Sequence, residues 1–391
     1  MKYDFSFVVA GMVLAGASGA SGIAAAQNDV SIYGVVDAAL AYSSNQDGHA
    51  NTYMRSGNQA SSRLGFKGHE ELGGGLQAVY VLEAGFNLDD GTASSAGSIF
   101  NRQAYVGLSS THAGSLTIGR QYTPYYLFVG PIAQVGAVTG ATGAHPGDID
   151  GLDVTVRSSN SVSYTSPAWH GVQVGLLAAS GEQGRHASSG DTLSAAVKYD
   201  AGAWNFALGY QSLKNGPDGA NWDPSASSSF SKSPVNAGYL SAGAVDYLAA
   251  AGHYHSGSLG LGGVFTRVEY KPDAHSQFTD TAGFNTAGTY AAWQTGTPWL
   301  LSAAVSVTRA SAANGIADAA EYRQLSLEQI YALSARTVIY LLEARQNAHG
   351  NTLDAHGVPV AAVAVIGDSQ TGTPSSNGRQ HVFMAGLRHT F

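Results

Sequence analysis

Few residues have the types and spacing for chemistry, and none completes a known catalytic motif. His253 and His255 are two apart, which in a strand puts both imidazoles on one face and would allow a two-ligand metal pair, although such pairs are commonly surface residues. His69-Glu70-Glu71 lacks the second histidine of a zinc-protease helix, and no Gly-x-Ser-x-Gly elbow occurs. Gly73-Gly74-Gly75 precedes a strand-like segment, so it predicts a turn rather than a phosphate cradle. We therefore expect neither an enzyme nor a metal or other cofactor.

Arginine is the other chemically useful residue, because its charge is permanent. Arg63 shares strand parity with Lys67, and Arg157 shares it with Ser161, so both arginines belong to the polar sides of their segments. Arg120 shares parity with apolar residues, which leaves its orientation open.

The elements that would position these residues are strands, because period-two alternation dominates the chain after Gln27. Successive strand residues point to opposite faces, so each alternating segment predicts a strand with one apolar and one wetter face. The predicted apolar sets are Leu64 and Phe66; Trp204, Phe206, Leu208 and Tyr210; Leu301, Ala303, Val305 and Val307; and Val338, Tyr340, Leu342 and Ala344.

Short and long connections alternate between these strands. Tight turns are predicted at residues 71–75, 166–170, 200–202 and 334–336, and long loops at residues 45–58, 214–238, 271–283 and 351–378. This layout is typical of transmembrane β-barrels, and a count of about sixteen strands gives the even number that single-chain bacterial barrels have. The predicted fold is an all-β, antiparallel transmembrane barrel.

Composition agrees with a chain that meets both lipid and water. Charged residues make up only 12% and mean hydropathy is −0.04, whereas globular domains carry about 25% charged residues. The net charge of −8 includes no basic run, which excludes electrostatic binding of nucleic acid. The absence of cysteine suits an exported protein.

The N-terminus predicts a signal peptide over residues 1–26, followed by one barrel domain over residues 27–391. Lys2 precedes an apolar core at residues 5–14, and small residues lead to an A-x-A cleavage site at Ala24-Ala25-Ala26. The core is shorter than the roughly 20 residues that span a bilayer, so a membrane anchor is the weaker alternative. Export by the general secretory route is expected.

Seven blocks in order over nearly the whole mature chain carry a family resemblance. They lie at residues 30–37 (VSIYGVVD), 62–68 with 71–76 (SRLGFKG, ELGGGL), 102–108 (RQAYVGL), 116–124 (LTIGRQYTP), 160–167 (NSVSYTSP), 331–337 (YALSART) and 386–391 (GLRHTF). Together they resemble the trimeric Gram-negative general porins, most closely those of β-proteobacteria. The resemblance implies an outer-membrane homotrimer through which small polar solutes and ions diffuse passively.

The resemblance also implies a constriction loop, here about residues 125–156, that folds into the lumen. A row of guanidinium groups opposite carboxylates sets a transverse field across a narrow gap. The loop lacks the family's Pro-Glu-Phe-Gly-Gly segment, so we expect a locally positive, weakly anion-selective pore despite the negative net charge. The alternative is that some arginines only pair with Glu83 or Asp37. The basic-wall candidates are Arg63, Arg102, Arg120 and Arg157, and the acidic-loop candidates are Asp148, Asp150 and Asp153.

The last strand carries its own signal. Phe383, Leu387 and Phe391 share one face at even spacing, which predicts a lipid-facing stripe. The resemblance implies that the terminal aromatic residue is recognised by the barrel assembly machinery. Outer-membrane lipids, including lipopolysaccharide, are the other expected partners.

Two other classes stay open from the residues alone: a secreted all-β binding or adhesion protein and an outer-membrane barrel enzyme. A soluble β-sandwich also alternates and has glycine-rich turns. Aromatic residues near strand ends, such as Trp204 and Trp293, favour the membrane barrel, because amphipathic rings settle at the lipid–water interface.

Overall fold

The computed structural model describes residues 29–153, 156–181, 190–215, 233–368 and 374–391. The signal-peptide prediction and the predicted loop positions Asn221 and Thr371 lie outside the described residues. None of the helices in these ranges is long and apolar enough to cross a membrane.

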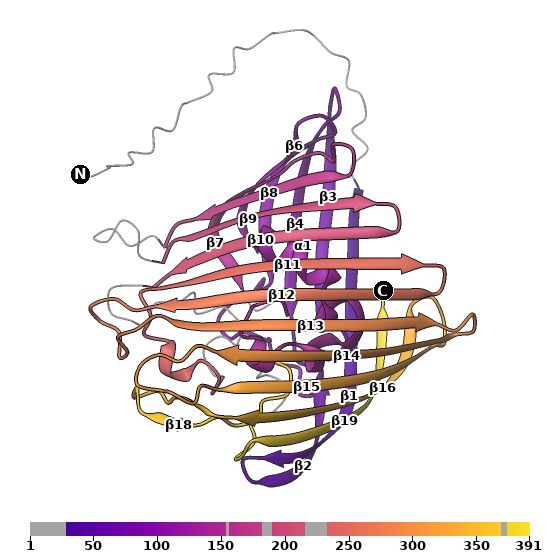
Figure 1. The fold of residues 1–391 in the computed structure, drawn as a ribbon. Coiled ribbons are helices and arrows are strands. Elements are labelled where there is room, and N and C mark those ends of the chain that lie inside the picture. Colours follow the sequence, from indigo (N-terminus) through magenta and orange to yellow (C-terminus); the bar gives the residue numbers. More distant parts are fainter. Residues whose placement is uncertain (1–28, 154–155, 182–189, 216–232, 369–373) are drawn as a thin grey trace, which may run out of the picture.

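The strands form one closed antiparallel barrel (Figure 1). Each barrel strand pairs with the next barrel strand along the chain, except that β2 and β3 both pair with β1. The last strand pairs with both β16 and β1, which closes the ring. The barrel strands are β1 (Asp29–Gln46), β2 (His49–Ser56), β3 (Arg63–Gly73), β4 (Leu76–Gly85), β5 (Gln103–Ser110), β6 (Gly114–Tyr122), β7 (Arg157–Thr165), β8 (Val172–Ala179), β9 (Thr192–Ala201), β10 (Trp204–Lys214), β11 (Ala244–Ser256), β12 (Leu259–Lys271), β13 (Ala282–Gln294), β14 (Trp299–Ala310), β15 (Glu321–Ala332), β16 (Thr337–His349) and β19 (Arg379–Thr390).

Helical turns and one small hairpin occupy three of the connections. Between β6 and β7 lie α1 (Pro124–Val129), η1 (Gly130–Ile132), η2 (Val135–Thr139), η3 (Gly140–Gly143) and η4 (Pro146–Asp148). A further turn, η5 (Ala237–Tyr239), precedes β11, and β17 (Asn351–Leu353) pairs with β18 (Pro359–Ala361) between β16 and β19.

The barrel has the predicted sixteen strands, because β2 and β3 together form one interrupted strand. The first half of β1 pairs with β3 and its second half with β2. The prediction of a long loop at residues 45–58 is therefore wrong. Only Asp47 and Gly48 separate β1 from β2, both with positive φ. Small polar residues in this hairpin hid its strand character, since they are uncommon in strands.

The four predicted tight turns are confirmed, and they all join strands at one end of the barrel. They connect β3 to β4, β7 to β8, β9 to β10 and β15 to β16. Gly73, Gly74 and Gly75 all have positive φ, which glycine adopts without steric cost, so this run is a turn as predicted. The longer connections at residues 272–281 and 350–378 leave from the opposite end.

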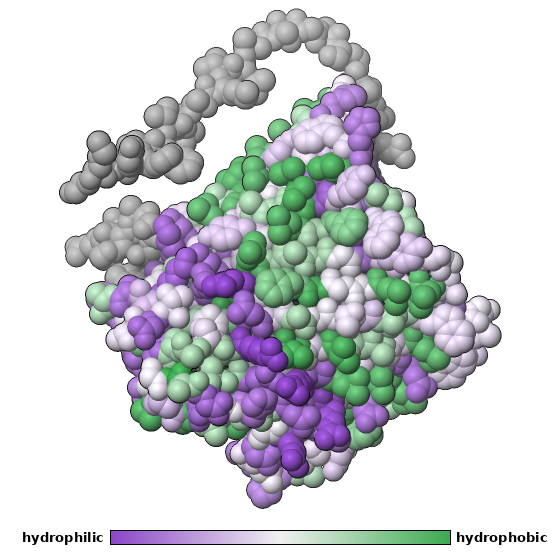
Figure 2. Space-filling model, in the orientation of Figure 1, coloured by the Kyte–Doolittle hydropathy of each residue, from purple (hydrophilic) through white to green (hydrophobic). Residues whose placement is uncertain are grey.

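The outer surface is apolar over most of the barrel height (Figure 2). Trp204, Phe206, Leu208 and Tyr210 on β10 are all exposed on this surface, as predicted. On β16 the predicted faces are reversed. Val338, Tyr340, Leu342 and Ala344 are buried inside the barrel, and Ile339 and Leu341 face outward. The interior set packs with Ile366 from the loop between β16 and β19, so this part of the inner wall is dry.

The topology predicts which ends face the cell exterior. The chain contains no cysteine, so a single introduced thiol reports only its own position. Gln277, exposed between β12 and β13, lies on the long-loop end, and Ala335, exposed between β15 and β16, on the tight-turn end. A maleimide reagent too bulky for the pore should label Gln277→Cys on intact cells and Ala335→Cys only after the outer membrane is opened. The reverse pattern would refute this orientation.

Candidate functional site

The connection between β6 and β7 turns into the barrel and lines its inner wall. Thr123 caps α1 by accepting the backbone N–H of Tyr126 at 3.5 Å, and Pro124 occupies the first turn, where proline costs no hydrogen bond. Tyr125 is fully buried, and its backbone N–H donates to Ser194 on the inner face of β9. This connection lies where the constriction loop was expected, and we call residues 123–156 the constriction loop.

The tip of the constriction loop is anchored at the interruption between β2 and β3. The backbone N–H of Ala141 donates to the carbonyl of Asn58 at 2.8 Å, and the Thr142 hydroxyl donates to the Asn58 side chain. Gly140 lies so close to Asn58 that an added Cβ would meet its carbonyl oxygen at 2.2 Å. The break in the second strand thus provides the contact that holds the loop tip.

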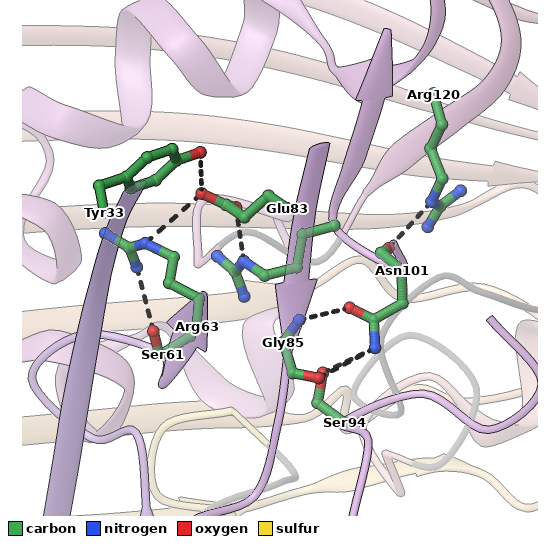
Figure 3. Close-up of polar contacts among 9 residues, drawn as sticks. Tyr33, Ser61, Arg63, Glu83, Gly85, Ser94, Asn101 and Arg120 are labelled. Carbon is green, nitrogen blue, oxygen red and sulfur yellow. Dashed lines mark hydrogen bonds and ion pairs between the residues drawn. The ribbon is translucent and has the colours of Figure 1, made fainter. Parts of the chain in front are cut away.

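A buried carboxylate binds two of the predicted wall arginines (Figure 3). Glu83 accepts a 2.8 Å hydrogen bond from Nε of Arg102, a 2.9 Å bond from the Tyr33 hydroxyl and a 3.6 Å ion pair from Arg63. Arg63 and Arg102 thus make the pairing with Glu83 that the alternative expected. Asp37 instead accepts hydrogen bonds from the Tyr340 hydroxyl and from the backbone N–H of Ala60. Because one carboxylate serves two guanidinium groups, this cluster keeps a positive excess.

Tyr122 connects the next arginine to this cluster. The guanidinium carbons of Arg102 and Arg157 lie 5.8 and 5.2 Å from the centre of the Tyr122 ring. A cation over an aromatic face is attracted to it, so one ring holds both side chains. Tyr122 pairs with Arg157 across β6 and β7, which fixes their common level in the barrel. Arg63, Arg102 and Arg157 therefore form one basic wall on β3, β7 and the approach to β5.

Arg120 lies apart from this wall. Its Nε donates to the carbonyl of Asn101 at 2.9 Å, and Nη1 donates to the Ser159 hydroxyl at 2.8 Å. The register between β6 and β7 shifts between Gly119 and Gln121. Such a bulge re-aims side chains locally, which accounts for the burial of Arg120 although its parity is that of exposed Ile118. Arg120 thus joins the connection between β4 and β5 to β7.

The three loop acids do not act alike. Asp150 is fully buried, and its Oδ2 bonds to His145 at 2.5 Å and to the Thr266 hydroxyl at 2.8 Å. Burial opposes ionisation, but His145 and Thr266 outweigh it and hold the pKa of Asp150 below its ordinary value. The prediction that Asp150 faces the pore is therefore wrong. Its carboxylate is buried and binds His145 within the loop and Thr266 on β12.

Asp148 and Asp153 lie near each other at the end of the loop. Asp148 Oδ1 accepts the backbone N–H of Asp153 at 2.9 Å. Burial and then Asp153 raise the pKa of Asp148 well above its ordinary value, and burial and then Asp368 do the same for Asp153. Arg55 and then Arg102 are the cations that act on Asp153 and oppose this rise in its pKa. The buried surroundings of both carboxyl groups thus oppose their ionisation.

Two charged residues near Asp153 were missed from the sequence. Arg55 on β2 is 6% exposed and its Nη2 lies 3.3 Å from Oδ1 of Asp368, which belongs to the loop between β16 and β19. Arg55 was hidden in a segment taken for a loop. Asp368 had no signal of its own, since its inward position depends on contacts made far away in the sequence.

Comparison with known proteins assigns the family. A family model described as Gram-negative porin matches residues 10–351. The chain belongs to the Gram-negative porin family. It is 36% identical over 183 residues to an outer membrane porin protein of Bordetella pertussis, covering 43% of this chain and 46% of that protein. It is 32% identical over 219 residues to outer membrane porin protein 32 of Delftia acidovorans, covering 52% of this chain and 60% of that protein. The chain thus spans about half the length of these curated relatives.

The porin fold is matched over almost the entire chain. An anion-selective porin from Comamonas acidovorans superposes with a TM-score of 0.71 at 23% identity, covering 93% of this chain and all of that one. OmpT of Vibrio cholerae gives a TM-score of 0.63 at 14% identity, covering 93% of this chain and 98% of that one. As a Gram-negative porin, the protein resides in the bacterial outer membrane.

Proposed function

We propose that this porin forms a water-filled channel for passive diffusion of small hydrophilic solutes and ions, without enzymatic activity. The observation that carries the proposal is a set of charged side chains inside a closed barrel: Glu83 and Tyr122 hold Arg63, Arg102 and Arg157 beside one another, and the constriction loop adds Asp153 within electrostatic range of Arg102. Charged residues inside a transmembrane barrel are costly unless water or partners surround them. A permeation path explains why they are concentrated at one level.

The channel prefers small anions. The basic wall has three arginines against the single fixed carboxylate of Glu83, and the pKa values of Asp148 and Asp153 are raised. The relative with the matching fold from Comamonas acidovorans carries the description anion-selective. Charges at the narrowest point dominate permeation, since loop charges are screened within a Debye length of about 8 Å at physiological salt.

Assembly and partners complete the proposal. Residues 1–26 act as a signal peptide, the barrel assembly machinery inserts the chain, and three copies associate, as in the trimer form of Vibrio cholerae OmpT. Outward-facing Arg309 and Arg323 both bind Glu321, at 2.6 and 2.5 Å, beyond the apolar band that includes Val305. A hydrophilic band crosses this face over β14 to β16 in Figure 2. Their excess positive charge suits phosphate-bearing lipid headgroups, lipopolysaccharide included.

Planar-bilayer recording tests the channel. The purified, detergent-extracted protein should give discrete conductance steps, and a salt gradient should give a reversal potential on the anion side. Heat-modifiable migration on gels should accompany it, because the folded barrel resists detergent. A mature chain that is soluble without detergent, or a folded barrel without conductance, would overturn the proposal.

A further inference from the structure

The loop between β16 and β19 also enters the barrel. After the β17–β18 hairpin, residues 362–368 run along the interior, and we call them the inner segment. Ala364, Val365 and Ile366 are at most 2% exposed. Ile366 packs on Tyr340 and Leu342, the β16 residues that sequence parity had placed on the outside. The inner face of β16 therefore packs against the inner segment.

Three buried glutamines on adjacent strands hold the inner segment by its backbone. Gln324, Gln346 and Gln380 lie directly opposite one another on β15, β16 and β19. Gln346 both accepts from the N–H of Val365 and donates to its carbonyl, each at 2.6 Å. Gln380 accepts the N–H of Ile366 at 3.0 Å. A buried amide without partners is costly, so this row is explained by the segment that satisfies it.

The inner segment is joined to the constriction loop. The N–H of Gly147 donates to the carbonyl of Gly367 at 2.8 Å, and the N–H of Asp368 donates to the carbonyl of Ala141 at 3.1 Å. Gln324 donates to the carbonyls of Thr142 and Ala144. The two segments therefore form one body inside the barrel, with Asp368 at its edge beside Arg55.

We propose that the inner segment is a second constriction element and that Asp368, paired with Arg55, is a specificity-determining residue of the pore. Of the acidic residues in the constriction loop, Asp150 does not face the pore, because its carboxylate is bound to His145. Asp368 comes from a different loop and brings a further carboxylate into the barrel, where it pairs with Arg55 and lies close to Asp153 of the constriction loop. It lowers the anion preference that the arginines alone would give. This inference rests on the proposed channel function.

Opposite charge changes in one pair give a sharp test. Asp368→Asn keeps the size of the side chain but removes the negative charge opposite Arg55. The reversal potential in a salt gradient should therefore move toward the value for a purely anion-selective pore. Arg55→Gln removes the positive charge of the pair and should move the reversal potential toward the cation limit. Asp354→Asn is the matched control, since it removes the same charge from an exposed turn of the same loop, and it should leave the potential unchanged.

A shortened loop tests the constriction itself. Asn347 and Arg379 are paired partners on β16 and β19, so a tight turn can replace the connection between them without moving either strand. This variant should show a several-fold higher single-channel conductance. If the wild-type protein conducts but both charge variants keep its reversal potential, or the shortened folded variant keeps its conductance, the inference is wrong and the channel function stands. If the folded wild-type protein does not conduct, the channel proposal itself fails.

Discussion

Replacing Arg63, Arg102 and Arg157 together with serine should turn an anion-preferring pore into a cation-preferring one. These three side chains make the positive side of the constriction, and Glu83, Asp153 and Asp368 would remain. Two unit charges 4 Å apart interact by about 1 kcal/mol in water and about 4 kcal/mol at an intermediate dielectric. Losing three cations should therefore lower the anion-to-cation permeability ratio by about tenfold or more, read from reversal potentials in a salt gradient.

Two controls distinguish the effect of charges at the constriction from the effect of the protein's total charge on ion selectivity. Arg267, Arg309 and Arg323 are exposed on the outer face, so changing these three to serine alters net charge equally and should leave selectivity unchanged. Arg120→Ser should change selectivity less than Arg102→Ser, because Arg120 is bound to Asn101 and Ser159 away from the wall. An unchanged reversal potential in the first triple variant, with the barrel folded, would show that these arginines do not govern permeation.

The strand pattern was predictable because each strand has a lipid side that must be apolar. Alternation on β10 and the tight turns with positive-φ glycines needed no knowledge of distant contacts. The interior was less predictable, since a barrel lumen is not uniformly wet. On β16 apolar residues occur on both faces, and Tyr340 points inward, where its hydroxyl donates to Asp37 and its ring lies in one cluster with Ile366. Parity within one strand cannot report that.

Site residues divide in the same way. Arg63 lies on the interior side that its parity indicated, where it pairs with Glu83. Arg157 is buried too, but its parity with Ser161 does not hold, because the register shift between β6 and β7 and the positive φ of Asn160 lie between them. Arg120 is buried although its parity predicts an exposed side chain. The cause is a register shift, which depends on how β6 pairs with β7. The position of the Asp150 carboxylate depends on His145 and Thr266. The position of the Arg55 side chain depends on Asp368, which lies 313 positions away in the sequence. Charge positions in folded-in loops are set by tertiary partners, which local sequence does not name.

The end of the chain should have the largest effect on assembly. Phe391 adds the last pair to the β1–β19 ladder that closes the barrel: its N–H donates to the carbonyl of Gly34, and the N–H of Gly34 donates to the carbonyl of Phe391, each at 3.1 Å. Its ring covers Gly34 on the outer face, where an added Cβ would lie 2.3 Å from a ring carbon. Phe383 and Leu387 continue this exposed stripe on the same face of β19. Deleting Phe391 removes the closing pair and an apolar anchor worth about 1.5–3 kcal/mol on burial.

Deletion of Phe391 should therefore lower the amount of folded protein in the outer membrane several-fold, while synthesis and export continue. Fractionation with heat-modifiable gel migration measures this. Gly34→Val keeps the terminal aromatic but blocks its place on β1, so it separates packing from recognition by the assembly machinery. Phe383→Ser is the control, because it removes an exposed aromatic from the same strand and leaves the closing pair intact. If the deletion variant reached wild-type levels, Phe391 would contribute neither to closure nor to assembly. Suppose that Gly34→Val reaches the wild-type amount of folded protein in the outer membrane and the deletion variant does not. The loss in the deletion variant would then be due to recognition by the assembly machinery, because the ring would be required without its contact to Gly34.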